Sequence, residues 1–387
     1  MKWIITLGVA LFGACAYGAP NAVYIGFDGA YGQKTNTAAQ AIELGARLAI
    51  AEINTNGGVL SGRPLELVTT DNQGLSTRGR DNYQELATRK DMVLVLGGKH
   101  SPVSVEVIPD VQRLKVPYAS VWGSANQITD TVMNDSYMFR LSLKDAWGVE
   151  AILKRAGKLS DNGKVCALIP NTVWGRSGEQ VIREKISGSK IQLVAVNWYN
   201  WGDTDFQAKI NDCVTQSAGA MILIANEPEG SLVVKQMAQL PAAKRIPIVS
   251  HWGITGGAFA ALTGTALNDV DLQVIQTFTF VNNQRPQAQA LARKVMLAQK
   301  VNAASEIISP VGVAQAYDMV YLAAAALKKA QSTNGSKIRD ALEALPPYDG
   351  VIKRYAPAFT KTRHDALDAQ QIVFVRLLPN GALAPVK

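Results

Sequence analysis

The stretch that decides the fold is Gly45-Ala46-Arg47-Leu48-Ala49-Ile50-Ala51-Glu52-Ile53-Asn54, which runs into Gly57-Gly58. Apolar residues recur at helical spacing over residues 37–54, so we expect a helix with one buried face, ended by the two glycines. The flanking segments 23–27 and 65–70 are rich in β-branched and aromatic residues and predict strands. The order strand, helix, strand is typical of a parallel sheet.

The same alternation continues along the chain. Further strands are predicted at 92–96, 116–121, 164–169, 191–196, 220–225, 246–249 and 371–375. Further helices are predicted at 76–90, 103–114, 178–185, 205–215, 230–240, 287–301, 311–330 and 336–344. The pattern restarts near residues 140–148, so we expect an α/β protein with two lobes. Each lobe should hold a mainly parallel sheet with helices on both faces.

Composition narrows the class of protein. The chain has 387 residues, of which 48% are hydrophobic and 18% charged, so it can fill more than one core and is not disordered. The net charge of +8 is spread along the sequence rather than clustered, which does not favour nucleic-acid binding. A positive charge spread in this way is compatible with binding of an anionic solute, or it can simply keep the surface soluble. The one strongly apolar stretch lies at the N-terminus, which excludes a polytopic membrane protein.

The N-terminus predicts export. Lys2 precedes the apolar run 3–12, and Ala16-Tyr17-Gly18 provides small residues for cleavage, so residues 1–18 are typical of a secretory signal peptide. Cys15 raises the alternative of a lipoprotein, which is less favoured because Phe12 is a poor first residue for that signal.

Cys166 and Cys213 remain after removal of the signal peptide. In an oxidising compartment they form either a disulfide that closes a loop of about 48 residues or two buried thiols. Two cysteines and three scattered histidines, at 100, 251 and 364, do not predict a metal site.

Motifs for catalysis and cofactors are absent from the sequence. It contains no G-x-G-x-x-G, no G-x-x-x-x-G-K-[ST], no H-E-x-x-H and no G-x-S-x-G. We therefore expect no cofactor, no catalytic residues and no enzymatic activity.

Several segments together resemble a known family. They are residues 45–58, Gly62-Arg63-Pro64-Leu65-Glu66-Leu67 with Asp71-Asn72-Gln73, Gly202-Asp203-Thr204-Asp205-Phe206, and Ala316-Tyr317-Asp318. In this order the chain is similar to the periplasmic solute-binding proteins of ABC transporters, in the type I Leu/Ile/Val-binding family. The resemblance runs from about Val23 to the C-terminus.

The resemblance implies a periplasmic monomer that closes around a small molecule and delivers it to an inner-membrane permease. It implies two lobes joined by three crossovers. The N-terminal lobe would hold residues 22–142 and 282–365, and the C-terminal lobe residues 143–281 and 366–387. A ligand sensor that feeds a membrane signalling protein is the alternative, because the same fold serves receptors.

The resemblance also implies ligand contacts. Family members hold a ligand carboxylate with hydroxyl residues in two loops, which correspond here to Ser101 and Ser124. Both serines follow a predicted strand and precede a helix, where hydroxyl and free N–H groups bind anions. From the other lobe, the corresponding positions are Trp174, Asn226, and His251 or Trp252.

One position departs from the amino-acid-binding pattern. The loop that usually supplies an acid for the ligand ammonium reads Ser250-His251-Trp252-Gly253. Glu227 or Glu229 could replace that acid from a neighbouring loop.

Tryptophans gather at the expected cleft. Trp122, Trp174 and Trp252 all fall at strand ends of the two lobes, and Tyr31 adds to the same wall. The resulting hypothesis is a ligand with a carboxylate and an aromatic or planar body. A cationic, amide or urea-type ligand stacked on tryptophan is the alternative.

Overall fold

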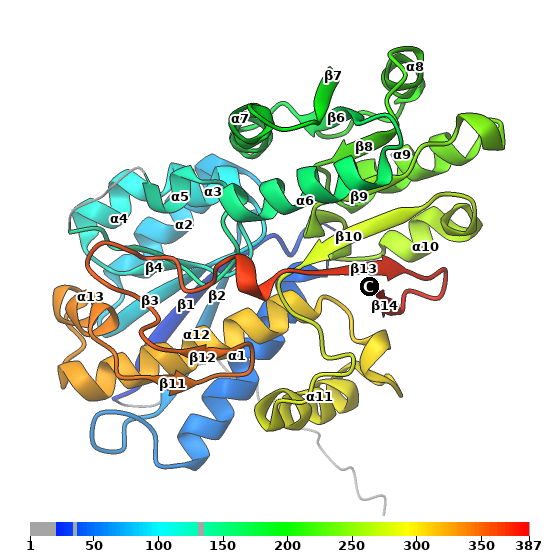
Figure 1. The fold of residues 1–387 in the computed structure, drawn as a ribbon. Coiled ribbons are helices and arrows are strands. Elements are labelled where there is room, and N and C mark those ends of the chain that lie inside the picture. The colour runs from blue at the N-terminus through cyan, green and yellow to red at the C-terminus, as the bar shows by residue number, and fades with distance from the viewer. Residues whose placement is uncertain (1–20, 34–36, 131–134, 387) are drawn as a thin grey trace, which may run out of the picture.

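The computed structural model describes residues 21–33, 37–130 and 135–386. It shows two lobes, each built on a sheet covered by helices, with connecting segments between them (Figure 1). The predicted signal peptide and Cys15 lie outside the described residues. Within the described part, no helix has both the length and the apolar character needed to cross a membrane.

The first sheet is fully parallel, with strand order β2-β1-β3-β4-β5. Its strands are β1 (Val23–Gly29), β2 (Leu65–Asp71), β3 (Met92–Gly97), β4 (Tyr118–Ser120) and β5 (Met138–Arg140). The helices around it are α1 (Ala38–Thr55), α2 (Ser76–Thr88), α3 (Ser101–Glu106), α4 (Ile108–Leu114), α5 (Gln127–Asp130), α12 (Pro310–Ala330) and α13 (Gly335–Glu343).

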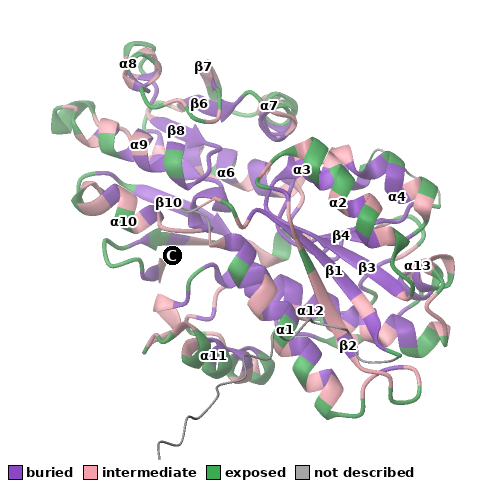
Figure 2. Ribbon diagram, turned by 180° about the vertical axis from the view of Figure 1, so that it is seen from behind, coloured by how far each residue is buried: buried purple, intermediate pink, exposed green. Residues whose placement is uncertain are grey.

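Both faces of this sheet are buried, as the apolar run of β3 predicts. Leu94 and Leu96 pack in the cluster that contains α1 and α12, whereas Met92 and Val95 pack against Tyr83 of α2. Figure 2 shows β1, β3 and β4 as buried along most of their length and the edge strand β2 as mostly intermediate, with exposed residues on the outer helices.

The second sheet has strand order β14-β13-β10-β9-β8-β6-β7, in which β13 pairs antiparallel with both β10 and β14 and the other pairs are parallel. Its strands are β6 (Lys164–Pro170), β7 (Gln192–Tyr199), β8 (Ala220–Leu223), β9 (Ile248–Ser250), β10 (Leu272–Gln276), β13 (Val373–Leu377) and β14 (Leu383–Pro385). Its helices include α6 (Asp145–Leu159), α7 (Val173–Ile186), α8 (Gln207–Thr215), α9 (Glu227–Ala238) and α10 (Phe259–Thr263), with short turns η1 (Ala242–Lys244), η2 (Trp252–Thr255) and η3 (Gly264–Asn268). A disulfide joins Cys166 of β6 to Cys213 of α8.

The remaining elements are α11 (Pro286–Gln299), η4 (Ala304–Glu306), the hairpin β11 (Tyr348–Asp349) and β12 (Arg354–Tyr355), and η5 (Ala369–Gln371). The two-lobed, mainly parallel α/β fold is confirmed.

The chain passes from one sheet to the other after β5, after β10 and after residue 365. The first and third passages lie side by side, since Arg140 donates its backbone N–H to His364 O and accepts that of Ala366. The side chain of Arg140 is fully buried and pairs with Asp365 at 2.6 Å. Backbone hydrogen bonds and a buried ion pair thus hold these two connecting segments together. The boundaries after 142, 281 and 365 stay a prediction.

Some predicted elements differ from the structure. The helix predicted at 103–114 is two helices, α3 and α4, because Pro109 lacks a backbone N–H and disrupts a continuous helix. The sequence pattern does not predict β5, α6 or β10. The strand predicted at 116–121 is reduced to the three residues of β4.

Candidate functional site

A small cavity lies where the carboxyl ends of the two sheets meet. Its lining residues are Lys99, Ser101, Trp122, Ser124, Trp174, Asn226, His251 and Gly253. They follow β3, β4, β6, β8 and β9, the edge at which open α/β sheets bind ligands. The structure thus brings six of the eight residues predicted from the sequence to one cavity.

Ser101 is positioned at the start of α3, directly after the turn that follows β3. Its Oγ accepts the backbone N–H groups of Ser124, at 3.1 Å, and Ala125, at 3.2 Å. These two bonds use both lone pairs of the hydroxyl oxygen. Its O–H hydrogen therefore remains to donate, and no described group in the structure accepts it.

Ser124 is oriented by His251 from the other lobe. His251 Nδ1 accepts the backbone N–H of Gly253 at 3.2 Å, so the proton of the neutral ring lies on Nε2. Nε2 lies 3.2 Å from Ser124 Oγ and donates to it. Ser124 thus accepts from His251 and keeps its own O–H hydrogen for another partner. Burial lowers the pKa of His251, which keeps the ring neutral.

Lys99 and Glu227 form a buried ion pair across the cleft, between Nζ and Oε2. Their side chains are 3% and 1% exposed. Burial lowers the pKa of Lys99 and raises that of Glu227, while the attraction between the two opposes both shifts. We take the pair as charged because each is the other's nearest counter-ion, and removing only one charge would leave the other unpaired.

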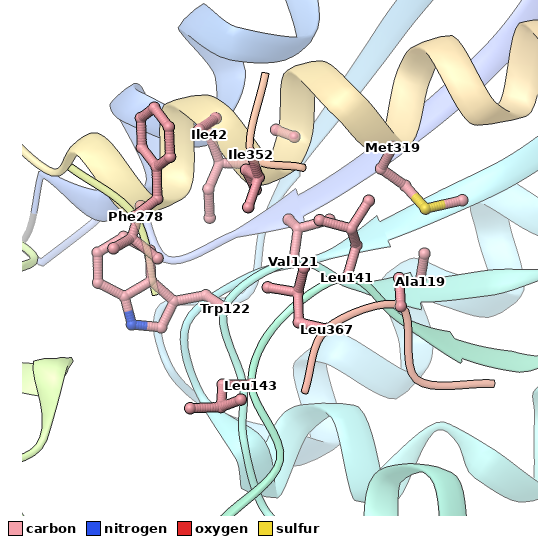
Figure 3. Close-up of a cluster of buried hydrophobic side chains, with 14 of the residues drawn as sticks. Ile42, Ala119, Val121, Trp122, Leu141, Leu143, Phe278, Met319, Ile352 and Leu367 are labelled. Atoms are coloured by element: carbon pink, nitrogen blue, oxygen red, sulfur yellow. The ribbon is translucent and has the colours of Figure 1, made fainter. Parts of the chain in front are cut away.

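Two tryptophans form apolar walls of the cavity. Trp122 lies on the first lobe, beside Phe278 and close to Ile42 (Figure 3). Trp174 packs edge-on to His251, with ring centroids 4.9 Å apart. Its Nε1 makes no hydrogen bond to a described group.

The other two predicted aromatic residues lie outside the lining. Trp252 is fully buried behind His251, with ring centroids 3.7 Å apart. Tyr31 donates its hydroxyl to Glu43 at 2.7 Å and packs against Phe27. The contacts of Tyr31 are thus within the first lobe.

Two further carboxylates stand behind the lining. Asp145 is fully buried, with Oδ1 3.5 Å from His251 Nε2. Glu229 accepts the backbone N–H of Gly202 at 3.0 Å, and its other oxygen is unpaired within the described structure. Lys99 and Asp145 were not singled out from the sequence. The signal for Lys99 was its position two residues before Ser101 in the loop after β3.

The geometry does not activate a serine nucleophile. In a hydrolytic triad, the acid holds one imidazole nitrogen and the serine lies on the other. Here Asp145 and Ser124 both face Nε2 of His251, while a backbone amide occupies Nδ1. The arrangement orients hydroxyl groups and is suited to holding a ligand.

Contacts between the lobes close the cleft around the cavity. Thr37 donates its backbone N–H to Gly256 O at 2.7 Å, and Asn126 donates its own to Ser177 Oγ at 3.0 Å. The two lobes are therefore in direct contact near the cavity.

A family model for periplasmic binding proteins matches residues 22–382. The chain belongs to this family. No curated protein matched the sequence. Solved structures show the same fold: a periplasmic binding protein type 1 from Bordetella pertussis is 20% identical, with TM-score 0.84 over 94% of this chain and 100% of that one.

Two further similar structures were determined with ligands. The branched-chain amino acid binding protein LivJ of Streptococcus pneumoniae, in complex with isoleucine, is 22% identical, with TM-score 0.78 over 95% of this chain and 99% of that one. An ABC transporter solute-binding protein from R. palustris, in complex with benzoate, is 16% identical, with TM-score 0.77 over 94% of this chain and 95% of that one.

Proposed function

We propose that the protein is the periplasmic receptor of an ABC importer and that its cleft holds a small aromatic or otherwise planar carboxylate. The observation that carries this proposal is the pair of serine hydroxyls. Ser101 and Ser124 each accept hydrogen bonds from the protein and keep an O–H to donate. A carboxylate accepts such bonds, and a bond to a charged group contributes about 1.5–3 kcal/mol.

The lining contains one cationic group that a ligand carboxylate could face. Lys99 is the one charged side chain among the described residues that line the cavity, given a neutral His251. A carboxylate between the serines and Lys99 would receive both hydrogen bonds and charge compensation.

The aromatic side chains that line the cavity favour a ligand with a flat body. Trp122 and Trp174 line the cavity from opposite lobes, so closure would bring both rings to the ligand. Flat groups gain from offset or edge-on packing with aromatic rings. Structures of similar fold hold benzoate and 4-hydroxybenzoate, which supports this choice of ligand class.

A zwitterionic amino acid is the second candidate, because LivJ holds isoleucine and Glu227 Oε1 has no partner among the described groups. Its ammonium group would need Glu227, which is already paired with Lys99. We therefore place the aromatic acid first.

In this account, the open protein takes up the ligand, the lobes close about the connecting segments at Arg140, and the closed form docks as a monomer on the permease. Closure is favoured because only the closed form provides contacts from both lobes at once.

A thermal-shift screen of the refolded, ligand-stripped mature protein tests the proposal. The panel contains benzoate, 4-hydroxybenzoate, leucine, a dicarboxylate and urea. A ligand at a hundred times its dissociation constant adds about 2.7 kcal/mol of stability. Stabilisation by the aromatic acids alone is the expected result. Stabilisation by leucine alone would assign the cleft to amino acids, and stabilisation by urea alone would assign it to amides.

A further inference from the structure

The cleft buries more negative than positive charge. Three carboxylates, Glu227, Glu229 and Asp145, are at most 5% exposed. Lys99 pairs with Glu227, and His251 is neutral for the reasons given above.

The other charged groups around the site do not change this balance. Arg140 donates from Nη1 to the backbone oxygen of Ser124. Its charge is compensated by Asp365, whose Oδ1 lies 2.6 Å from Arg140 Nε. The turn η2, which packs against α9, carries no titratable side chain. Glu227 is thus faced by Lys99 and, on its own helix, by Glu229.

A ligand carboxylate beside Lys99 would be a fourth buried negative charge. Glu227 has no room to move away from it, because it is 1% exposed and the backbone of Gly256 closes over it. A Cβ atom at Gly256 would lie 2.4 Å from Glu227 Oε1 and 2.9 Å from Lys99 Nζ. Oε1 itself is buried and has no hydrogen-bond partner in the described part of the chain.

We propose that an anionic ligand binds together with one proton, which Glu227 takes up from solvent on Oε1, so that Lys99 exchanges its counter-ion from Glu227 to the ligand. Lys99 stays an ammonium group, and binding of the ligand together with the proton adds no net charge to the cleft. This inference rests on the proposed function. Burial and the nearby Glu229 already raise the pKa of Glu227, and the ligand carboxylate would raise it further.

The experiment is isothermal titration calorimetry of the mature protein with benzoate, which stays ionised from pH 6.5 to 8.5. Titrations in phosphate and in Tris, which differ in ionisation enthalpy, give the number of protons bound per ligand. We expect an uptake of close to one proton at the upper end of the range. Because binding then requires a proton, the dissociation constant should rise by up to about tenfold per pH unit.

Glu227→Gln is the decisive variant, because a glutamine can still accept from Lys99 but cannot titrate. We expect it to bind benzoate without proton uptake and with a dissociation constant independent of pH. Glu229→Gln is the matched control, since its Oε1 can still accept from Gly202, and it should keep the proton uptake.

Benzoate binding without proton uptake by the wild type would overturn this inference and leave the proposed function intact. Loss of uptake in E229Q but not in E227Q would also overturn it. Failure of every aromatic carboxylate to bind would overturn both proposals.

Discussion

His251 accepts the backbone N–H of Gly253 on Nδ1 at 3.2 Å. That single bond fixes the tautomer of the ring and directs Nε2–H across the cleft to Ser124 Oγ. A residue of the second lobe thereby sets the donor direction of a hydroxyl on the first lobe. In this structure, the hydrogen bonding of Ser124 therefore depends on contact between the two lobes.

Ser124→Ala should weaken benzoate binding roughly ten- to a hundredfold, because a hydrogen bond to a charged group contributes about 1.5–3 kcal/mol. The measurement is the dissociation constant by calorimetry. Ser231→Ala is the control, since Ser231 is equally buried but donates to Pro228 O outside the cavity. An unchanged constant in S124A would remove this serine from the site.

Lys99→Met should lower the free energy of unfolding by about 3–5 kcal/mol, because it leaves Glu227 buried without its counter-ion. The double variant K99M/E227Q should recover much of that stability and still fail to bind benzoate. Urea denaturation and calorimetry measure the two effects. Wild-type affinity in the double variant would show that Lys99 does not contact the ligand.

His100 should make the protein less stable in acid. Burial, and then the charge of Lys99, lowers the pKa of His100 to about 3. The unfolded chain takes up this proton near pH 6.5 and the folded chain does not, so stability falls as the pH falls below about 6.5. The loss is about 1.4 kcal/mol per pH unit for one group.

His100→Leu should make the free energy of unfolding fall less steeply as the pH is lowered, by the share of one titrating group. His251 still contributes in the same direction, because its pKa is also lowered. The free energy of unfolding at pH 7, 6 and 5 tests it. Equal slopes for the variant and the wild type would exclude His100 as a source.

Replacing Cys166 and Cys213 together by alanine should lower the free energy of unfolding by about 4 kcal/mol in the chain-entropy treatment. Both sulfurs lie in the core cluster of the second sheet and not at the cavity. Benzoate affinity should therefore be unchanged. A parallel loss of affinity would mean that the disulfide shapes the cleft.

The alternation of strands and helices was predictable because buried faces repeat with the period of each element. The apolar run of β3 indicated that the segment is a strand and that both of its faces are buried. β5 was not predicted because three residues are too few for a periodicity to register, and β4, predicted at 116–121, is likewise only three residues long. Their pairing depends on neighbours far away in the sequence.

The serines of the site were predictable from the resemblance to the family, and their position after strand ends agrees with it. The Lys99 pair was not, because lysine is almost always exposed and its partner lies 128 residues further along the chain. The hydroxyl of Tyr31 illustrates the converse: nothing local predicts its bond to Glu43. Long-range partners decide which strand-end residues face the cavity.

The most direct test of the account is calorimetric titration of the ligand-stripped wild-type protein with benzoate and, separately, with leucine. We predict saturable one-to-one binding of benzoate and no heat of binding from leucine. Tight binding of leucine with none of benzoate would contradict the account and assign Glu227 to a ligand ammonium group.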